Sequence, residues 1–110
     1  MAFYIVLHHP DDRSVTRWSN EWETGSSDRI RTITTTTKIA REAEKAVKVY
    51  VHRCGFTGIP PAVVCEAKVL GVVPIDRASC LVRFETVRTM QVTPTVSPGA
   101  GQNSYLADKP

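Results

Sequence analysis

The sequence predicts an α+β fold, either a small β-barrel or a strongly curved mixed sheet, with one main short helix. Three observations favour this class. The chain opens on a continuous apolar run, a helical spacing of apolar residues follows near 38–46, and a period of two begins at Val47. With 110 residues, of which 42% are hydrophobic and 23% are charged, the chain can form one domain around one modest core.

The opening run, residues 3–8, is rich in aromatic and β-branched side chains. It predicts a buried central strand, which Pro10 and the polar turn after it end. Residues 11–29 are polar and show no clear period. Residues 29–34 alternate and are rich in β-formers, so we expect a short strand there.

One amphipathic helix is predicted over 38–46. Thr35 to Thr37 offer hydroxyl N-caps, and Ile39, Ala43 and Ala46 recur at helical spacing. Lys38 and Glu42 carry opposite charges four residues apart, which supports a helix.

Three strands should follow the helix as a meander. In 47–53, valines alternate with Lys48, Tyr50 and His52. The next strand covers 62–73, with a bulge or bend at Gly71, and the last covers 79–92, with an irregularity near 86–87 where the alternation slips. Short turns join the three strands, and such a meander suits a curved sheet.

The domain is expected to span 1–93. From residue 94 onward the chain is rich in proline and glycine and holds little that is apolar. We therefore predict a disordered tail over 94–110.

Composition narrows the function only partly. There are 14 Lys and Arg against 11 Asp and Glu, a net charge of +3, which is compatible with nucleic acid but not diagnostic. No apolar run is long enough for a membrane span or a signal peptide. The three cysteines are odd in number and widely spaced, which favours free thiols in a reducing cytoplasm. Cys65 and Cys80 lie on strands predicted to be neighbours, so an accidental pair is conceivable.

Catalytic and metal-binding patterns are weak. The sequence contains no nucleophile elbow, phosphate-binding glycine loop or H-E-x-x-H motif. His8 and His9 end the opening strand, but adjacent strand residues face opposite ways, so one metal ion would not be bound by both. We expect no metal and no cofactor, and we favour binding over catalysis.

The two tryptophans are the most informative residues. Trp18 and Trp22 lie in a polar segment, and arginines surround them in the sequence. Aromatic rings beside guanidinium groups suit the stacking of a nucleobase, although plain packing of both rings remains open. The arginines that could meet phosphates are Arg13, Arg17, Arg29 and Arg31.

Three stretches together resemble the EVE domains of the PUA-like superfamily. Residues 3–10 are similar to their aromatic-rich opening strand, 47–55 to the strand after their short helix, and 59–69 to the next strand. Residues 79–84 would form the strand after that, so that the resemblance covers roughly 60 residues. It implies a pseudo-barrel.

The resemblance also implies a pocket for a base turned out of a nucleic acid. This pocket would lie between the end of the first strand and the strand after the helix. Two histidines replace the polar pair that usually follows the first strand. The implied lining is His8, His9, His52, Arg53 and Cys54, with Trp18 and Trp22 as a stacking wall.

A second relative in that superfamily is the ASCH domain, some members of which hydrolyse acylated nucleosides. Residues 29–34 resemble its G-x-K-x-x-T type motif, with Arg29 in place of the glycine and Arg31 in place of the lysine. An arginine stays protonated and cannot act as the base in place of the lysine. We therefore rank a small hydrolase that acts on modified nucleosides second, behind the binding domain. A third hypothesis is a protein–protein interaction or accessory module of a mobile element, which an exposed apolar patch would favour.

Overall fold

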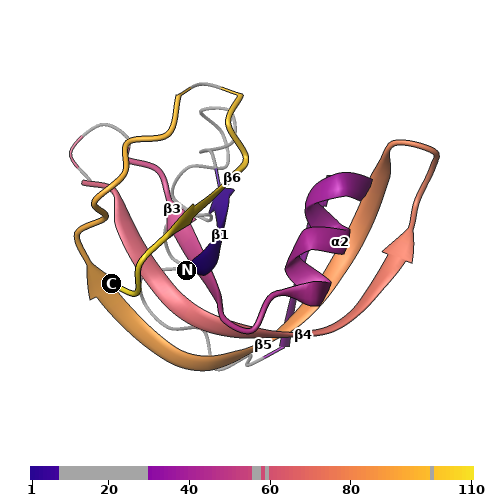
Figure 1. The fold of residues 1–110 in the computed structure, drawn as a ribbon, viewed down its shortest axis with the longest axis horizontal. Helices are drawn as coiled ribbons and strands as arrows, with labels where there is room; N and C mark the ends of the chain where they lie inside the picture. The colour runs from indigo at the N-terminus through magenta and orange to yellow at the C-terminus, as the bar shows by residue number, and fades with distance from the viewer. Residues whose placement is uncertain (8–29, 56–57, 59, 100) are drawn as a thin grey trace.

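The computed structural model describes residues 1–7, 30–55, 58, 60–99 and 101–110, with only the backbone described for 30–34. Six strands and one helix follow one another along these residues (Figure 1). Their order and bounds are β1 (Ala2–Leu7), β2 (Ile30–Thr36), α2 (Thr37–Lys45), β3 (Val49–Arg53), β4 (Ala62–Pro74), β5 (Ser79–Val92) and β6 (Ser104–Ala107).

The strands form one mixed sheet in the order β2-β5-β4-β3-β1-β6. β1 and β3 run parallel, and the other neighbouring pairs run antiparallel. The long strands β4 and β5 bend through the middle of the sheet, which curls into a half-barrel, and α2 lies inside the curl (Figure 1). The predicted α+β fold with a strongly curved sheet and one main short helix is thereby confirmed.

Two of the irregularities in the sheet lie where the sequence pattern predicted them, whereas the register shifts at Val51/His52 and Val63/Cys65 were not predicted. Between β4 and β5 the register shifts between Val69 and Gly71, and again where Thr86 and Arg88 face Ala67 and Glu66. Each shift adds a residue to one strand, and a bulge of this kind increases local twist and bending. Gly71 and Val87 therefore mark where the sheet turns.

The helix begins and ends close to the predicted positions. Thr36 is its N-cap, and the Thr36 hydroxyl accepts a hydrogen bond from the Ile39 N–H at 3.3 Å. Ala46 leaves the helical conformation and ends it. Ile39, Ala40 and Ala43 are buried, so the apolar stripe of α2 faces the sheet.

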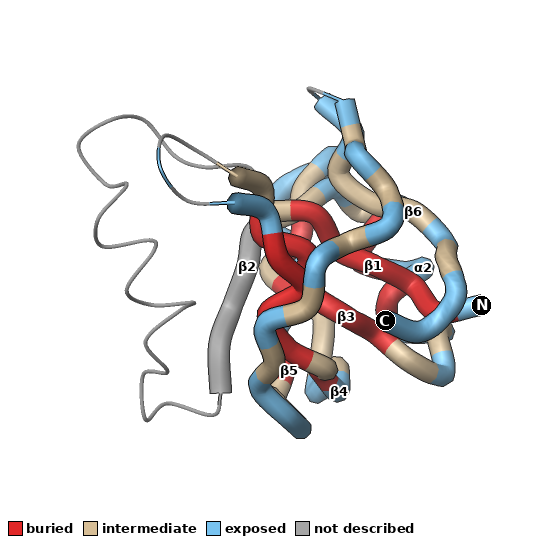
Figure 2. Tube along the Cα trace, turned by 90° about the vertical axis from the view of Figure 1, so that its left-hand side faces the viewer, coloured by how far each residue is buried: buried red, intermediate tan, exposed pale blue. Residues whose placement is uncertain are grey.

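Both faces of β1 and β3 are buried, which differs from the alternation predicted for 47–53. One face packs with α2 through Phe3, Ile5, Val49 and Val51. On the other, Tyr4 and Tyr50 pack with side chains from β5 and β6. Figure 2 shows β1 and β3 buried along most of their length. Val49–Arg53 has no solvent face because segments distant in the sequence cover both sides.

Part of the segment predicted to be disordered forms a strand. The chain reverses at Gly101, which has a φ of +86°, and the Gln102 N–H donates to the Gly99 carbonyl at 3.0 Å. β6 then pairs with β1, with Ala107 opposite Ala2. The prediction of disorder is wrong for 104–107, because this short strand is stabilised by contacts with β1 that composition does not reveal.

The register also separates two thiols that the sequence placed on neighbouring strands. Cys65 lies opposite Thr89, whereas Cys80 lies opposite Pro74. The accidental disulfide that the sequence left conceivable is therefore not a neighbouring pair in this sheet, and all three cysteines are free thiols.

Candidate functional site

The parallel pairing of β1 and β3 brings the carboxyl ends of these strands together. Leu7 is the partner of Arg53, and the Cys54 N–H donates to the Leu7 carbonyl at 3.0 Å. The chain therefore leaves both strands at the same edge of the sheet. Ligand sites commonly form at the carboxyl ends of parallel strands, so we treat this edge, defined by Leu7, Arg53 and Cys54, as the candidate site.

His52 is held within the protein at this edge. Its side chain is only 1% exposed, and its Nδ1 lies 2.6 Å from the Tyr105 hydroxyl. The two rings meet edge to face, with centroids 5.5 Å apart. Burial, with a smaller contribution from Tyr4, raises the pKa of Tyr105 far above its ordinary value. The Tyr105 hydroxyl and the His52 Nδ1 are within hydrogen-bond distance, and the tautomer of His52 decides which of the two donates.

Arg53 donates hydrogen bonds to two backbone carbonyls that follow β3. Its side chain is also 1% exposed. Nη2 donates to the Pro60 carbonyl at 2.9 Å, and Nη1 donates to the Cys54 carbonyl at 3.3 Å. Because a buried guanidinium is costly unless it is hydrogen-bonded, these bonds hold the Cys54 and Pro60 carbonyls against the Arg53 side chain.

Cys54 is the more accessible of the three predicted residues at the end of β3. It is partly buried. Burial raises the pKa of its thiol, and the Arg53 guanidinium opposes that shift. The raised pKa keeps the thiol protonated, so Cys54 offers a weak hydrogen-bond donor and apolar contact rather than a nucleophile.

Three tyrosines form a stack that the sequence analysis did not identify. The Tyr4 ring lies 5.2 Å from the Tyr50 ring and 4.7 Å from the Tyr105 ring, centroid to centroid. The Tyr4 hydroxyl donates to the Asp108 carbonyl at 2.6 Å. The sequence placed Tyr4 and Tyr50 in two predicted strands, which was the only sign of a contact between them. Tyr105 lies in the segment predicted to be a disordered tail, so its part in the stack could not be expected.

The other predicted site residues cannot be compared with the structure in the same way. His8, His9, Trp18, Trp22, Arg13, Arg17 and Arg29 lie outside the described residues. Arg31 is in β2, opposite Phe84 of β5, and only its backbone is described. In the sheet, β5 and β4 lie between β2 and β3, so Arg31 does not neighbour the candidate edge along the hydrogen-bonded ladder.

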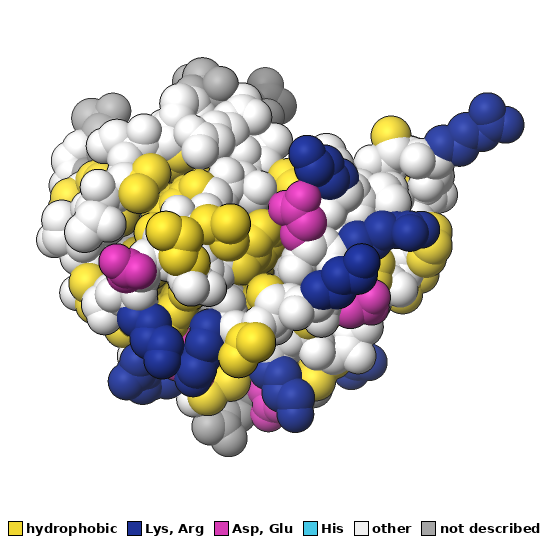
Figure 3. Space-filling model, viewed as in Figure 1, with side chains coloured by type: hydrophobic (Ala, Val, Ile, Leu, Met, Phe, Trp, Pro, Cys, Tyr) yellow, Lys and Arg dark blue, Asp and Glu magenta, His cyan; other side chains and the backbone are white. Residues whose placement is uncertain are grey.

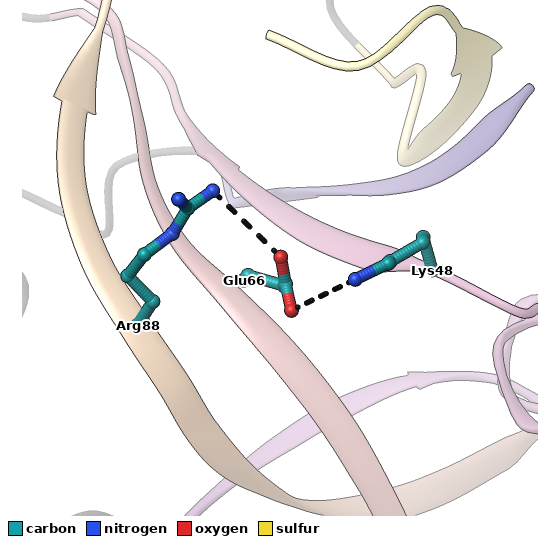
Figure 4. A network of polar contacts seen from close by, with 3 residues as sticks. All are labelled: Lys48, Glu66 and Arg88. Carbon is teal, nitrogen blue, oxygen red and sulfur yellow. Dashed lines mark hydrogen bonds and ion pairs between the residues drawn. The ribbon is translucent and has the colours of Figure 1, made fainter.

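A separate cluster of charges joins Lys48, directly before β3, to residues of β4 and β5. Glu66 receives Lys48 Nζ at 3.3 Å and Arg88 Nη2 at 3.8 Å, one on each carboxylate oxygen (Figure 4). The Glu66 side chain is 13% exposed, against 40% for Lys48 and 65% for Arg88. The carboxylate is thus the most deeply placed member, and the two cations lie nearer the solvent.

The described part of the chain shows neither a metal-binding cluster nor a helix that could span a membrane. No group of three His, Cys, Asp or Glu side chains there could hold a metal ion. Its helix is too short and too polar to cross a membrane.

Comparison of the chain with protein-family models, with curated proteins and with solved structures gives no match.

Proposed function

We propose that this protein is a non-catalytic binding domain that recognises a nucleobase-containing ligand, specifically a nucleic acid with an exposed or modified base. The observation that carries the proposal is the adjacency of the carboxyl ends of β1 and β3. The Leu7 carbonyl, at the end of β1, accepts from the Cys54 N–H, and the next two residues of the sequence after Leu7 are His8 and His9. This arrangement fits the pocket implied by the resemblance to EVE domains.

The buried residues at this edge suggest a division of roles. His52 and Arg53 are hydrogen-bonded to Tyr105 and to the backbone after β3, which makes them supports of the site. A binding site needs such support, because side chains that meet the ligand must be held in place. Direct contact with the base then belongs to Cys54, His8 and His9, and the indoles of Trp18 and Trp22 supply stacking.

The proposed energetics separate two kinds of contact. Arginines meet phosphates and give an affinity that depends on salt but carries no sequence information. The base leaves its stack at a cost of a few kcal/mol, and stacking on an indole returns about 1–3 kcal/mol. A cytoplasmic setting also belongs to the proposal, supported by the free thiols of Cys54, Cys65 and Cys80.

A fluorescence titration tests this function. The purified protein is titrated with short single strands, plain and base-modified, at low and at moderate salt. Arg17→Ala should weaken binding of every strand and reduce the salt slope by about 0.7. Trp18→Ala or Trp22→Ala should weaken binding by about 1–3 kcal/mol while leaving the slope almost unchanged.

Arg77→Ala is the matched control, because Arg77 is an exposed arginine in the turn between β4 and β5, away from the candidate edge. It should bind as the wild type does. If no strand quenches the fluorescence of the folded protein at low salt, the proposed function is wrong.

A further inference from the structure

A group of exposed apolar side chains lies near the turn of the long hairpin formed by β4 and β5. Of the seven large hydrophobic side chains that are exposed in the described part of the chain, three lie within residues 70–75. Leu70 is 44% exposed, Val73 is 58% exposed and Ile75 is 54% exposed. Single exposed hydrophobic residues are normal, but several gathered in one place indicate a surface that contacts a partner.

The register of the hairpin directs these side chains away from the helix. Val72 packs against the cluster that contains Ala40 of α2, so Val72 faces the helix. Because successive strand residues face opposite ways, Val73 and its ladder partner Leu81 lie on the outer face of the sheet. Ile75, two residues after Val73, continues that face. We call this group the hairpin patch, which consists of Leu70, Val73, Ile75 and Leu81.

Two exposed arginines flank the hairpin patch. Arg77 is in the turn, and Arg83 is in β5 two residues after Leu81. In Figure 3, yellow and dark blue side chains lie next to one another at the upper right, where the turn of the hairpin lies in Figure 1. Further along the two strands, Lys68 and Glu85 are ladder partners of opposite charge, so together they add no net charge.

The acidic residue of the turn is engaged within the turn. Asp76 Oδ1 accepts from the Ala78 and Ser79 N–H groups, each at 2.8 Å, and from the Ser79 hydroxyl at 2.9 Å. The hydrogen bond from Ala78, together with those from Ser79, lowers the pKa of the Asp76 carboxyl. Arg77 and Arg83 therefore stand against one carboxylate that already has three donors, which leaves the end of the hairpin basic.

We infer that the hairpin patch binds the surface of an anionic lipid bilayer. Val73 and Ile75 enter the boundary between the headgroups and the acyl chains, and Arg77 and Arg83 meet the anionic headgroups. Binding at such a surface combines burial of apolar area with attraction between cations and anionic lipids, and the end of the hairpin offers both.

The shape of the hairpin favours a bilayer over other partners. Its turn projects beyond α2 (Figure 1), and a narrow projecting end offers little area to a rigid protein, for which a stable interface buries roughly 1,000 Å² or more. A fluid lipid surface adapts to such an end. Nucleic acid fits less well, because phosphates would pair with the arginines and leave Val73 and Ile75 in water.

The hairpin patch is also separate from the candidate edge. Arg53, at the candidate edge, pairs with Ala62 at the start of β4, whereas the patch lies at the other end of that strand. The inference therefore does not depend on the proposed nucleic-acid function.

Flotation of the full chain with lipid vesicles tests the inference. Vesicles of phosphatidylcholine and phosphatidylserine in about equal parts should bind the protein about tenfold more strongly than phosphatidylcholine alone, and salt should weaken this binding. The double variant Val73→Ser with Ile75→Ser should bind about tenfold more weakly, at low and at high salt alike, because it removes apolar area without changing the charge. Arg77→Gln should weaken binding about fivefold at low salt and reduce its salt dependence.

Leu106→Ser and Arg88→Gln are the matched controls. Leu106 is an exposed apolar residue of β6, and Arg88 is an exposed arginine of β5 that pairs with Glu66. Arg88→Gln removes the same net charge as Arg77→Gln, so the difference between these two variants isolates the position of the charge. Both controls should bind the vesicles almost as the wild type does.

Circular dichroism establishes that each variant is folded, which the exposure of all the substituted side chains leads us to expect. The inference is overturned if the wild type does not bind anionic vesicles at low salt or binds phosphatidylcholine equally well. It is also overturned if the Val73 and Ile75 double variant binds unchanged, or if the controls weaken binding as much as the variants of the hairpin patch do.

Discussion

At the scale of single residues, Tyr105 joins parts of the described chain that lie far apart in the sequence. Its ring stacks on Tyr4, and its hydroxyl pairs with His52, which is 53 positions earlier in the sequence. One aromatic residue thereby links β6 with both strands of the parallel pair. The Tyr105 hydroxyl is one of the contacts that hold the buried His52 ring.

Replacing Tyr105 with phenylalanine should lower the free energy of unfolding by about 1–3 kcal/mol, because the buried His52 Nδ1 loses the hydroxyl while the ring is kept. Urea denaturation measures the change. Leu106→Ala is the control on the same strand. Leu106 is 61% exposed, so its truncation should cost no more than about 0.5 kcal/mol. Equal unfolding midpoints for Tyr105→Phe and the wild type would contradict the role given to this hydrogen bond.

The same residue predicts an alkaline limit to stability. Burial raises the pKa values of Tyr4 and Tyr105 in the folded state above their ordinary value of 10.0. Above pH 10 the unfolded chain therefore loses these protons while the folded chain keeps them, so the free energy of unfolding falls as the pH rises. Urea denaturation on either side of pH 10 should show this fall. Tyr105→Phe should show a shallower one, and an identical pH dependence would refute the assignment.

At the scale of elements, the sequence predicted best where the pattern is local. The slip in alternation near Val87 and the glycine at 71 located two of the three register shifts in the long hairpin, and the hydroxyls at 35–37 located the start of α2. β6 escaped prediction because four residues carry too little pattern. The burial of His52 and Arg53 escaped it for a related reason, because their cover comes from Tyr105 and Pro60, which no local spacing reveals.

β6 should therefore be necessary for stability, although the composition of 94–110 predicted a disordered tail. Removing residues 97–110 takes away the Tyr105 ring and uncovers Tyr4, which should lower the free energy of unfolding by about 3 kcal/mol or more. Removing only 109–110 is the control and should cost about 0.5 kcal/mol at most.

Hydrogen exchange localises the effect of the longer truncation. The Val6 amide, which donates to Asn103 at 2.9 Å, should lose protection. The Cys54 amide, which donates to Leu7 within the parallel pair, should keep more of its protection. Unchanged protection at Val6 in the truncated protein would show that β6 does not hold the edge of β1.

At the scale of the whole molecule, the described chain begins and ends in the same place. Ala2 and Ala107 are partners in the ladder between β1 and β6, and the two ends lie close together in Figure 1. The long hairpin of β4 and β5 extends to the other side, and its turn at Asp76 is exposed. At one side of the molecule the two termini are therefore paired in the sheet, and at the other side the hairpin turn is exposed to solvent.

A circular permutant follows from this arrangement. Joining the ends through a short glycine-rich linker and opening the chain between Asp76 and Arg77 should preserve a cooperative unfolding transition, because both changes fall on exposed backbone. Opening the chain between Cys65 and Glu66 is the control, and it should abolish that transition because it cuts the buried part of β4. Far-ultraviolet circular dichroism during urea titration distinguishes the two. Loss of folding in the first permutant would contradict the placement of the ends.

The pairing of Ala2 with Ala107 also has a consequence for folding during synthesis on the ribosome. β1 leaves the ribosome before β6, its antiparallel neighbour, which is made roughly 5–20 s later at ordinary rates of synthesis. Until then one edge of an apolar strand has no partner from its own chain, and an unpaired strand of this kind is prone to associate with other chains. Translation speed and holding chaperones should therefore affect the yield of this protein more than they would for a fold that closes on itself as it emerges.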